Sequence, residues 1–189
     1  MSINLIKGSC ADQEVDAIVN AANKYLLAGS GICGAIFKKA GLDELQAECN
    51  TKNIPLNDGD AVITKPYGIK NAKGIIHAVG PNFSITPNDF ESLFNAYYNS
   101  LKVLMENDLH SISFPLISSG IFGGNLENPV GESTIECLRA YYQFLEDYSD
   151  YEISVVLCAF TDKEYALASQ VFNNYDRESD DYSFKRRSR

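Results

Sequence analysis

Two asparagines and two glycine-rich turns are the residues of this sequence best suited to chemistry. Asn20 and Asn23 follow a short apolar run, and a turn rich in glycine occupies residues 29–34. A second turn of this kind occupies residues 118–124, after another apolar run. Such turns expose backbone N–H groups, and a helix N-terminus adds the positive end of its dipole, so each can bind a phosphate without Lys or Arg. Two turns that close from opposite sides fit a diphosphate better than a single phosphate.

Strands and helices must position these turns, and the periodicity of apolar residues predicts where they lie. Helix starts are indicated by Asn88, with Glu91 placed to complete a capping box, and by Asn128 followed by Pro129. Because strands and helices alternate, we predict an α/β fold, a three-layer α/β/α sandwich with a mixed, mostly parallel sheet of about six strands. The predicted strands are 3–6, 15–20, 61–64, 74–79, 111–117 and 153–160, and the predicted helices are 34–50, 90–104, 129–145 and 164–174.

The histidines and cysteines argue against several kinds of active site. The sequence contains two histidines, His77 and His110, and neither lies beside a nucleophile or a second metal ligand. A Ser-His-Asp triad and a histidine zinc site are therefore not indicated, and we predict that His77 is a core residue with satisfied hydrogen bonds. The five cysteines form no C-x-x-C pair, and we expect no disulfide framework, no metal and no cofactor. The P-loop motif and a complete dinucleotide-binding fingerprint are also absent.

Composition bounds the class of protein. The chain of 189 residues fits one domain, predicted over residues 1–175, with a mobile charged C-terminal tail over residues 176–189. The formal net charge of −9 argues against nucleic acid as a partner. The sequence shows no signal peptide and no apolar run long enough to span a membrane, so we expect a cytoplasmic protein without a membrane partner, and a monomer.

Four motifs follow one another along the chain. They are Val15-Asp-Ala-Ile-Val-Asn-Ala-Ala-Asn23, Gly29-Ser-Gly-Ile-Cys-Gly-Ala-Ile36, Ile76-His-Ala-Val-Gly-Pro81 and Phe114-Pro-Leu-Ile-Ser-Ser-Gly-Ile-Phe-Gly123. Their order resembles the macro domain family, the ADP-ribose-binding module. The resemblance covers residues 3–174 and is closest to the bacterial branch that removes ADP-ribosyl groups or deacetylates O-acetyl-ADP-ribose. It implies ADP-ribose or an ADP-ribosylated protein as the partner.

The resemblance also implies a role for individual residues. Asn23 would meet the distal ribose and help to set the attacking water, as the one catalytic residue, and Asn20 would hold neighbouring backbone in place. Phe160 would stack on the adenine, although without the resemblance it would be interpreted as a core aromatic residue. The two turns would enclose the diphosphate through Gly31, Ile32 and Cys33 on one side and Ser118, Ser119, Gly120, Ile121 and Phe122 on the other, with Phe122 also against the distal ribose.

The chain departs from the family pattern at both ends of the implied site. Many members have an Asp that binds the adenine amino group where this chain has Ser9, followed by Cys10. A hydroxyl accepts that hydrogen bond without charge assistance, so selectivity for adenine is expected to be weaker by about 1 kcal/mol. Active bacterial hydrolases have an Asp at the position of Cys33. They also have a His at the position that Phe37 occupies in this chain.

These departures leave three functions open. The first is hydrolysis of ADP-ribosyl esters or of O-acetyl-ADP-ribose, with the phosphate of the ligand positioning the water, as is understood for viral macro domains that lack this Asp. The second is a reader that binds ADP-ribose without turnover, favoured by Cys33. The third is recognition of another nucleotide or of RNA, suggested by Ser9 and opposed by the net charge. A thiol at a helix start can have a lowered pKa, but with no base in the sequence pattern we predict no nucleophilic role for Cys33.

Overall fold

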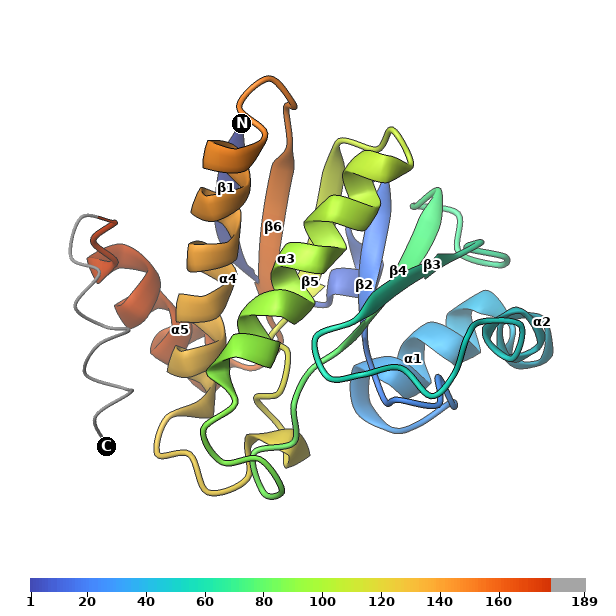
Figure 1. The fold of residues 1–189 in the computed structure, drawn as a ribbon, viewed down its shortest axis with the longest axis horizontal. Coiled ribbons are helices and arrows are strands. Elements are labelled where there is room, and N and C mark those ends of the chain that lie inside the picture. The colour runs from blue at the N-terminus through green and yellow to red at the C-terminus, as the bar shows by residue number, and fades with distance from the viewer. Residues whose placement is uncertain (178–189) are drawn as a thin grey trace.

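A six-stranded sheet with the strand order β1-β6-β5-β2-β4-β3 forms the centre of the computed structural model, which describes residues 1–177 (Figure 1). Neighbouring strands are parallel except for β3 and β4, which are antiparallel. The prediction of a mixed, mostly parallel sheet is therefore confirmed. The strands are β1 (Ser2–Lys7), β2 (Ala17–Ala22), β3 (Ala61–Thr64), β4 (Gly74–Val79), β5 (Ser111–Pro115) and β6 (Ser154–Ala159).

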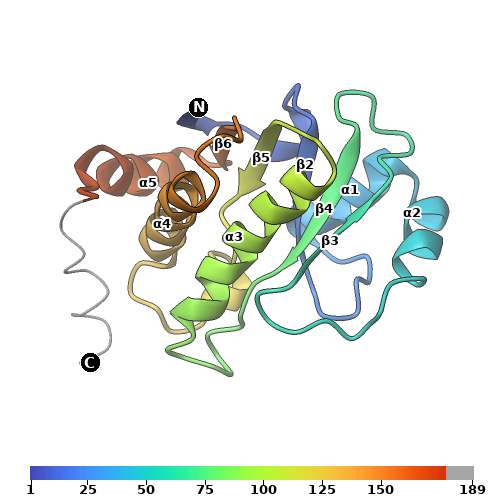
Figure 2. The same cartoon turned by 45° about the horizontal axis from the view of Figure 1, so that its top comes forward.

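Helices cover both faces of this sheet, as the three-layer prediction requires (Figures 1 and 2). On one face, α1 and α2 pack over the apolar side chains of β2 and β4, whereas α3 and α4 cover the opposite face. The last helix, α5, packs beside α4 and β1 at the sheet edge. None of the described helices is long and apolar enough to cross a bilayer. The α-helices are α1 (Gly31–Ala40), α2 (Leu42–Cys49), α3 (Phe90–Glu106), α4 (Pro129–Asp147) and α5 (Asp162–Asn174), and the short 3-10 helices are η1 (Cys10–Asp12) and η2 (Ile121–Gly123).

The central strand β2 contributes side chains to both layers because successive residues of a strand point to opposite faces. Ala17 and Val19 belong to the core beneath α3 and α4, and Ile18 and Ala22 belong to the core beneath α1. The same alternation places Asn20 on the α1 side of the sheet. The strand that precedes the first glycine turn is thus buried on both faces.

Two helix predictions were wrong in detail. The single helix predicted over 34–50 is two helices, because the chain turns at Gly41, whose φ of 105° favours glycine. The cap of α3 is Asp89, which accepts from the N–H of Ser92 at 3.1 Å, so Asn88 and Glu91 form no capping box. The start predicted at Asn128 and Pro129 is confirmed.

The described chain ends beyond the predicted domain boundary of residue 175. Arg177 pairs with Glu146 of α4, and its guanidinium lies 5.2 Å from the ring centroid of Tyr142. Residues 178–189, which make up most of the predicted tail, lie outside the described residues.

Candidate functional site

A pocket of about 730 Å³ opens at the carboxyl ends of β2 and β5. The ladder between these strands consists of two pairs, Ala17 with Ile112 and Ile18 with Ser113, although both strands continue further. Beyond these two pairs the strands are not paired with each other, and the residues that follow each strand line the pocket. In open α/β sheets this crevice is the usual place of a ligand.

The first glycine turn forms one wall of the pocket and leads into α1. Gly31 has a φ of 60°, in the left-handed region, and begins the helix. The N-cap residue, Ser30, makes no side-chain hydrogen bond to the helix. The first N–H groups of α1 therefore remain for a ligand at the positive end of the helix dipole.

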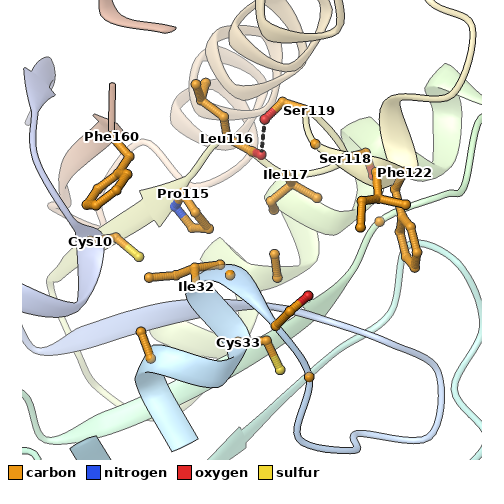
Figure 3. Close-up of a pocket in the computed structure, with 18 of the residues that line it drawn as sticks. Cys10, Ile32, Cys33, Pro115, Leu116, Ile117, Ser118, Ser119, Phe122 and Phe160 are labelled. Atoms are coloured by element: carbon orange, nitrogen blue, oxygen red, sulfur yellow. Dashed lines mark hydrogen bonds between the residues drawn. The ribbon is translucent and has the colours of Figure 1, made fainter. Parts of the chain in front are cut away.

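The second glycine turn forms the opposite wall and is held by its own hydroxyl groups. Ser118 donates to the carbonyl oxygen of Pro81 at 2.7 Å, and Ser119 donates to that of Leu116 at 2.8 Å (Figure 3). A Cβ atom at Gly80 would lie 2.3 Å from the Ser118 hydroxyl oxygen, so only glycine permits this approach. Both serine hydroxyls hold the loop, which leaves its backbone N–H groups as donors for an anion.

The pocket is elongated, with an aromatic ring at each end. Figure 3 shows Phe160 and Cys10 at one end and Phe122 at the other, with Ile32 and Cys33 along the α1 side. Phe160 is 70% exposed, so its interpretation as a core aromatic residue is wrong. An exposed ring beside a pocket offers a face on which a planar base can stack.

Asn23 lies at the pocket, where its amide holds the adjoining loop. Its Nδ2 donates to the carbonyl oxygen of Leu27 at 2.8 Å, and its Oδ1 accepts from the N–H groups of Tyr25 and Leu27 at 3.2 and 3.0 Å. Both ends of the amide are engaged with one segment of backbone. In this structure Asn23 therefore sets the conformation of residues 25–27 at the pocket edge.

Asn20 does not line the pocket, in contrast to its place in the predicted ligand-binding set. It is 1% exposed beneath α1, and its Nδ2 lies 3.0 Å from Nδ1 of His77 and 3.6 Å from the thiol of Cys33. The register of β2 and β4 pairs Asn20 directly with His77. The Asn20 amide thus contacts the side chains of His77 and Cys33, and not the neighbouring backbone that the resemblance implied.

His77 is a satisfied core histidine, as predicted. With the Asn20 amide donating to Nδ1, the proton lies on Nε2, which is 2.9 Å from the hydroxyl oxygen of Thr64. Burial, assisted by the charge of Lys52, lowers the pKa of His77 to about 4. The imidazole is therefore neutral in the folded protein at neutral pH.

This shift predicts a loss of stability in mild acid. The unfolded chain takes up a proton at His77 below pH 6.5, whereas the folded chain does so only near pH 4. The free energy of unfolding therefore has its full value above pH 6.5 and decreases as the pH falls, because protonation of His77 favours the unfolded chain. We expect urea unfolding to show a free energy about 2 kcal/mol lower at pH 5 than at pH 7.5. The half-exposed His110 provides the control, since His110→Ala should retain this dependence and His77→Gln should lose it. Equal stability of the wild-type protein at the two pH values would contradict the prediction.

The thiols at the pocket are poor nucleophiles. Burial raises the pKa of Cys33, and this effect exceeds the lowering by hydrogen bonds from Asn20 and from the backbone of Gly29. The lowered pKa considered for a thiol at the start of α1 is therefore wrong. Burial also raises the pKa of Cys10 well above its usual range, and its thiol lies 3.4 Å from the carbonyl oxygen of Val19 as a donor.

Ser9 is placed at the Phe160 end of the pocket, but its hydroxyl serves the chain. It is the N-cap residue of η1 and accepts from the N–H of Ala11 at 3.3 Å. Asp12, the acidic residue of the same short helix, does not line the pocket. One of the two acceptor positions of the Ser9 hydroxyl is thus already used within the chain.

The structure brings together every predicted ligand-binding residue except Asn20. The two glycine turns, which are 84 or more residues apart in sequence, face each other across one pocket. The lining residues outside the predicted ligand-binding set are mostly small or apolar, and many of them lie at the carboxyl end of a strand or just after it, which was the available signal. They are Gly8, Ala21, Ala22, Gly29, Ser30, Ala35, Gly80, Pro115, Leu116, Ile117, Cys158 and Glu164.

This architecture defines an α/β protein with an anion-binding pocket at the carboxyl ends of its strands. The family model of the macro domain matches residues 19–130, and the chain belongs to the macro domain family. It is 40% identical to a macro domain-containing protein of Caldanaerobacter subterraneus, over 93% of this chain and 98% of the relative. It is 36% identical to the ADP-ribose glycohydrolase MACROD2 of Xenopus laevis, over 92% of this chain but 40% of the relative. The Trypanosoma brucei macrodomain in complex with ADP-ribose superposes with a TM-score of 0.76 at 32% identity, covering 89% of this chain and 68% of that one.

Proposed function

We propose that this protein binds ADP-ribose and hydrolyses ADP-ribosyl esters on proteins or O-acetyl-ADP-ribose. The observation that carries the proposal is the single elongated pocket in which two N–H-rich turns face each other, with the exposed ring of Phe160 at one end. The turns fit a diphosphate and the ring fits a base. The relatives support this ligand, because MACROD2 is named an ADP-ribose glycohydrolase and the T. brucei macrodomain was crystallised with ADP-ribose.

Catalysis in this proposal is mainly positioning. Among the described residues, no Lys or Arg lines the pocket and no side-chain base lies at Cys33. The ligand's own phosphate would orient a water for attack at the anomeric carbon, with the Asn23 segment and the Phe122 end of the pocket confining the distal ribose. A closed, preorganised cleft can supply a large rate factor in this way.

A reader that binds ADP-ribose without turnover is the second candidate. It is favoured by the buried thiol of Cys33, whose raised pKa makes it neither a base nor a nucleophile. In a reader the two turns and Phe160 would have the same roles, and the distal end would lack an activated water.

A turnover assay on a mono-ADP-ribosylated protein, beside a calorimetric titration with ADP-ribose, separates the candidates. Hydrolysis together with one-to-one binding supports the enzyme, and one-to-one binding without hydrolysis supports the reader. Neither heat nor a thermal shift at millimolar ADP-ribose would contradict both.

A further inference from the structure

One carboxylate lines the pocket among the described residues, that of Glu164. It comes from the first turn of α5, four residues after Phe160, and so lies at the end of the pocket that has the exposed ring. The remaining lining residues are apolar, small or neutral and polar. A fixed negative charge opposes a diphosphate nearby, so its position at this end favours the phosphates near the glycine turns and the base near Glu164.

The carboxylate is held in place by its own chain. Oε2 of Glu164 accepts from the N–H groups of Phe160 and Thr161 at 3.0 and 2.8 Å, and the Thr161 hydroxyl accepts in return from the N–H of Glu164 at 3.1 Å. This reciprocal pair is a capping box. Both bonds to the carboxylate use Oε2, and within residues 1–177 Oε1 has no hydrogen-bond partner. One oxygen of an oriented carboxylate is thus free to accept a bond from a ligand.

The side chains of Ser9 and Cys10 at this end are uncharged, and each makes a hydrogen bond within the chain. The hydroxyl oxygen of Ser9 accepts from Ala11, and the Ser9 carbonyl oxygen accepts from Nε2 of Gln13 at 3.0 Å. The Cys10 thiol acts as a donor to Val19. Glu164, as the charged group, is therefore the strongest hydrogen-bond acceptor beside the ring of Phe160.

We propose that Glu164 determines the base specificity of the pocket, accepting a hydrogen bond from the exocyclic amine of a base stacked on Phe160. The inference rests on the proposed binding of ADP-ribose and adds to it a residue that selects adenine over bases with a keto oxygen at that position. A carboxylate accepts strongly from an amine and opposes a carbonyl oxygen, so it discriminates between the two.

The variant Glu164→Gln tests this with little disturbance of the fold. Glutamine also completes capping boxes, so its side-chain oxygen can keep the bonds to Phe160 and Thr161. Its NH₂ group then occupies the place of Oε1, which exchanges an acceptor for a donor. Glu91→Gln is the matched control, because Glu91 also lies in the first turn of a helix and does not line the pocket.

The experiment is a calorimetric titration of wild type and both variants with ADP-ribose and with its inosine analogue, in which a keto oxygen replaces the amine. We expect wild type and Glu91→Gln to bind ADP-ribose about tenfold more tightly than the analogue. In Glu164→Gln the preference should fall to about twofold or reverse, with the melting midpoint maintained. An unchanged preference, or an equal loss for both ligands, would overturn the role of Glu164 while leaving the proposed function standing. Absence of ADP-ribose binding by wild type would instead overturn the proposed function together with this inference.

Discussion

Replacement of Asn23 by alanine is expected to lower turnover of an ADP-ribosylated protein by about 10²-fold. The substitution removes three hydrogen bonds between the amide and the backbone of Tyr25 and Leu27, and so releases the segment that is proposed to confine the distal ribose. Initial rates of wild type and Asn23→Ala with the ADP-ribosylated protein, at saturating and at limiting concentrations, measure the effect on kcat and on kcat/KM.

Two further variants make the result specific. Asn23→Asp keeps an oxygen that accepts from Tyr25 and Leu27 but loses the donor to the Leu27 carbonyl, and should show an intermediate rate. Cys33→Ala should leave turnover within a few-fold, because the buried thiol has a raised pKa. Loss of activity in Cys33→Ala with full activity in Asn23→Ala would contradict the proposed mechanism.

Replacement of Gly34 by alanine is expected to weaken ADP-ribose binding by at least tenfold. Gly34 does not line the pocket, but a Cβ atom there would lie 2.5 Å from the carbonyl oxygen of Gly29 in the first turn. Backbone must therefore move, and overpacking of this kind costs about 1–3 kcal/mol. The gain in helix propensity from Gly to Ala, about 1 kcal/mol, offsets only part of that cost.

Calorimetry and thermal unfolding of Gly34→Ala measure the two effects. Gly29→Ala is the control in the same turn, because its Cβ atom would meet the Cys33 thiol at an ordinary 3.7 Å, and its melting midpoint should stay unchanged. Wild-type affinity in Gly34→Ala would show that the position of the first turn does not determine binding.

Local sequence determined the elements, the class of fold and the residues of both turns. The continuous apolar run of β2, the succession of Asn128 and Pro129 and the runs of glycine each encode a backbone conformation within a few residues. Where local signals compete, as at Gly41 and at Asp89, the prediction was wrong, since a turn and a cap depend on how the chain packs a few residues further on.

Tertiary structure alone decided which side chains reach the pocket. Whether Asn20 faces a ligand or His77 depends on the register of β2 with β4, and whether Cys33 is exposed depends on how α1 lies over that pair. Glu164 reaches the pocket because β6 lies between β1 and β5 in the sheet, so that the start of α5 follows β6 to the pocket. Most other lining residues come from positions 8–35 and 115–122. Periodicity records which face of an element is apolar but not which elements become neighbours, and that order of strands is fixed by packing between residues far apart in sequence.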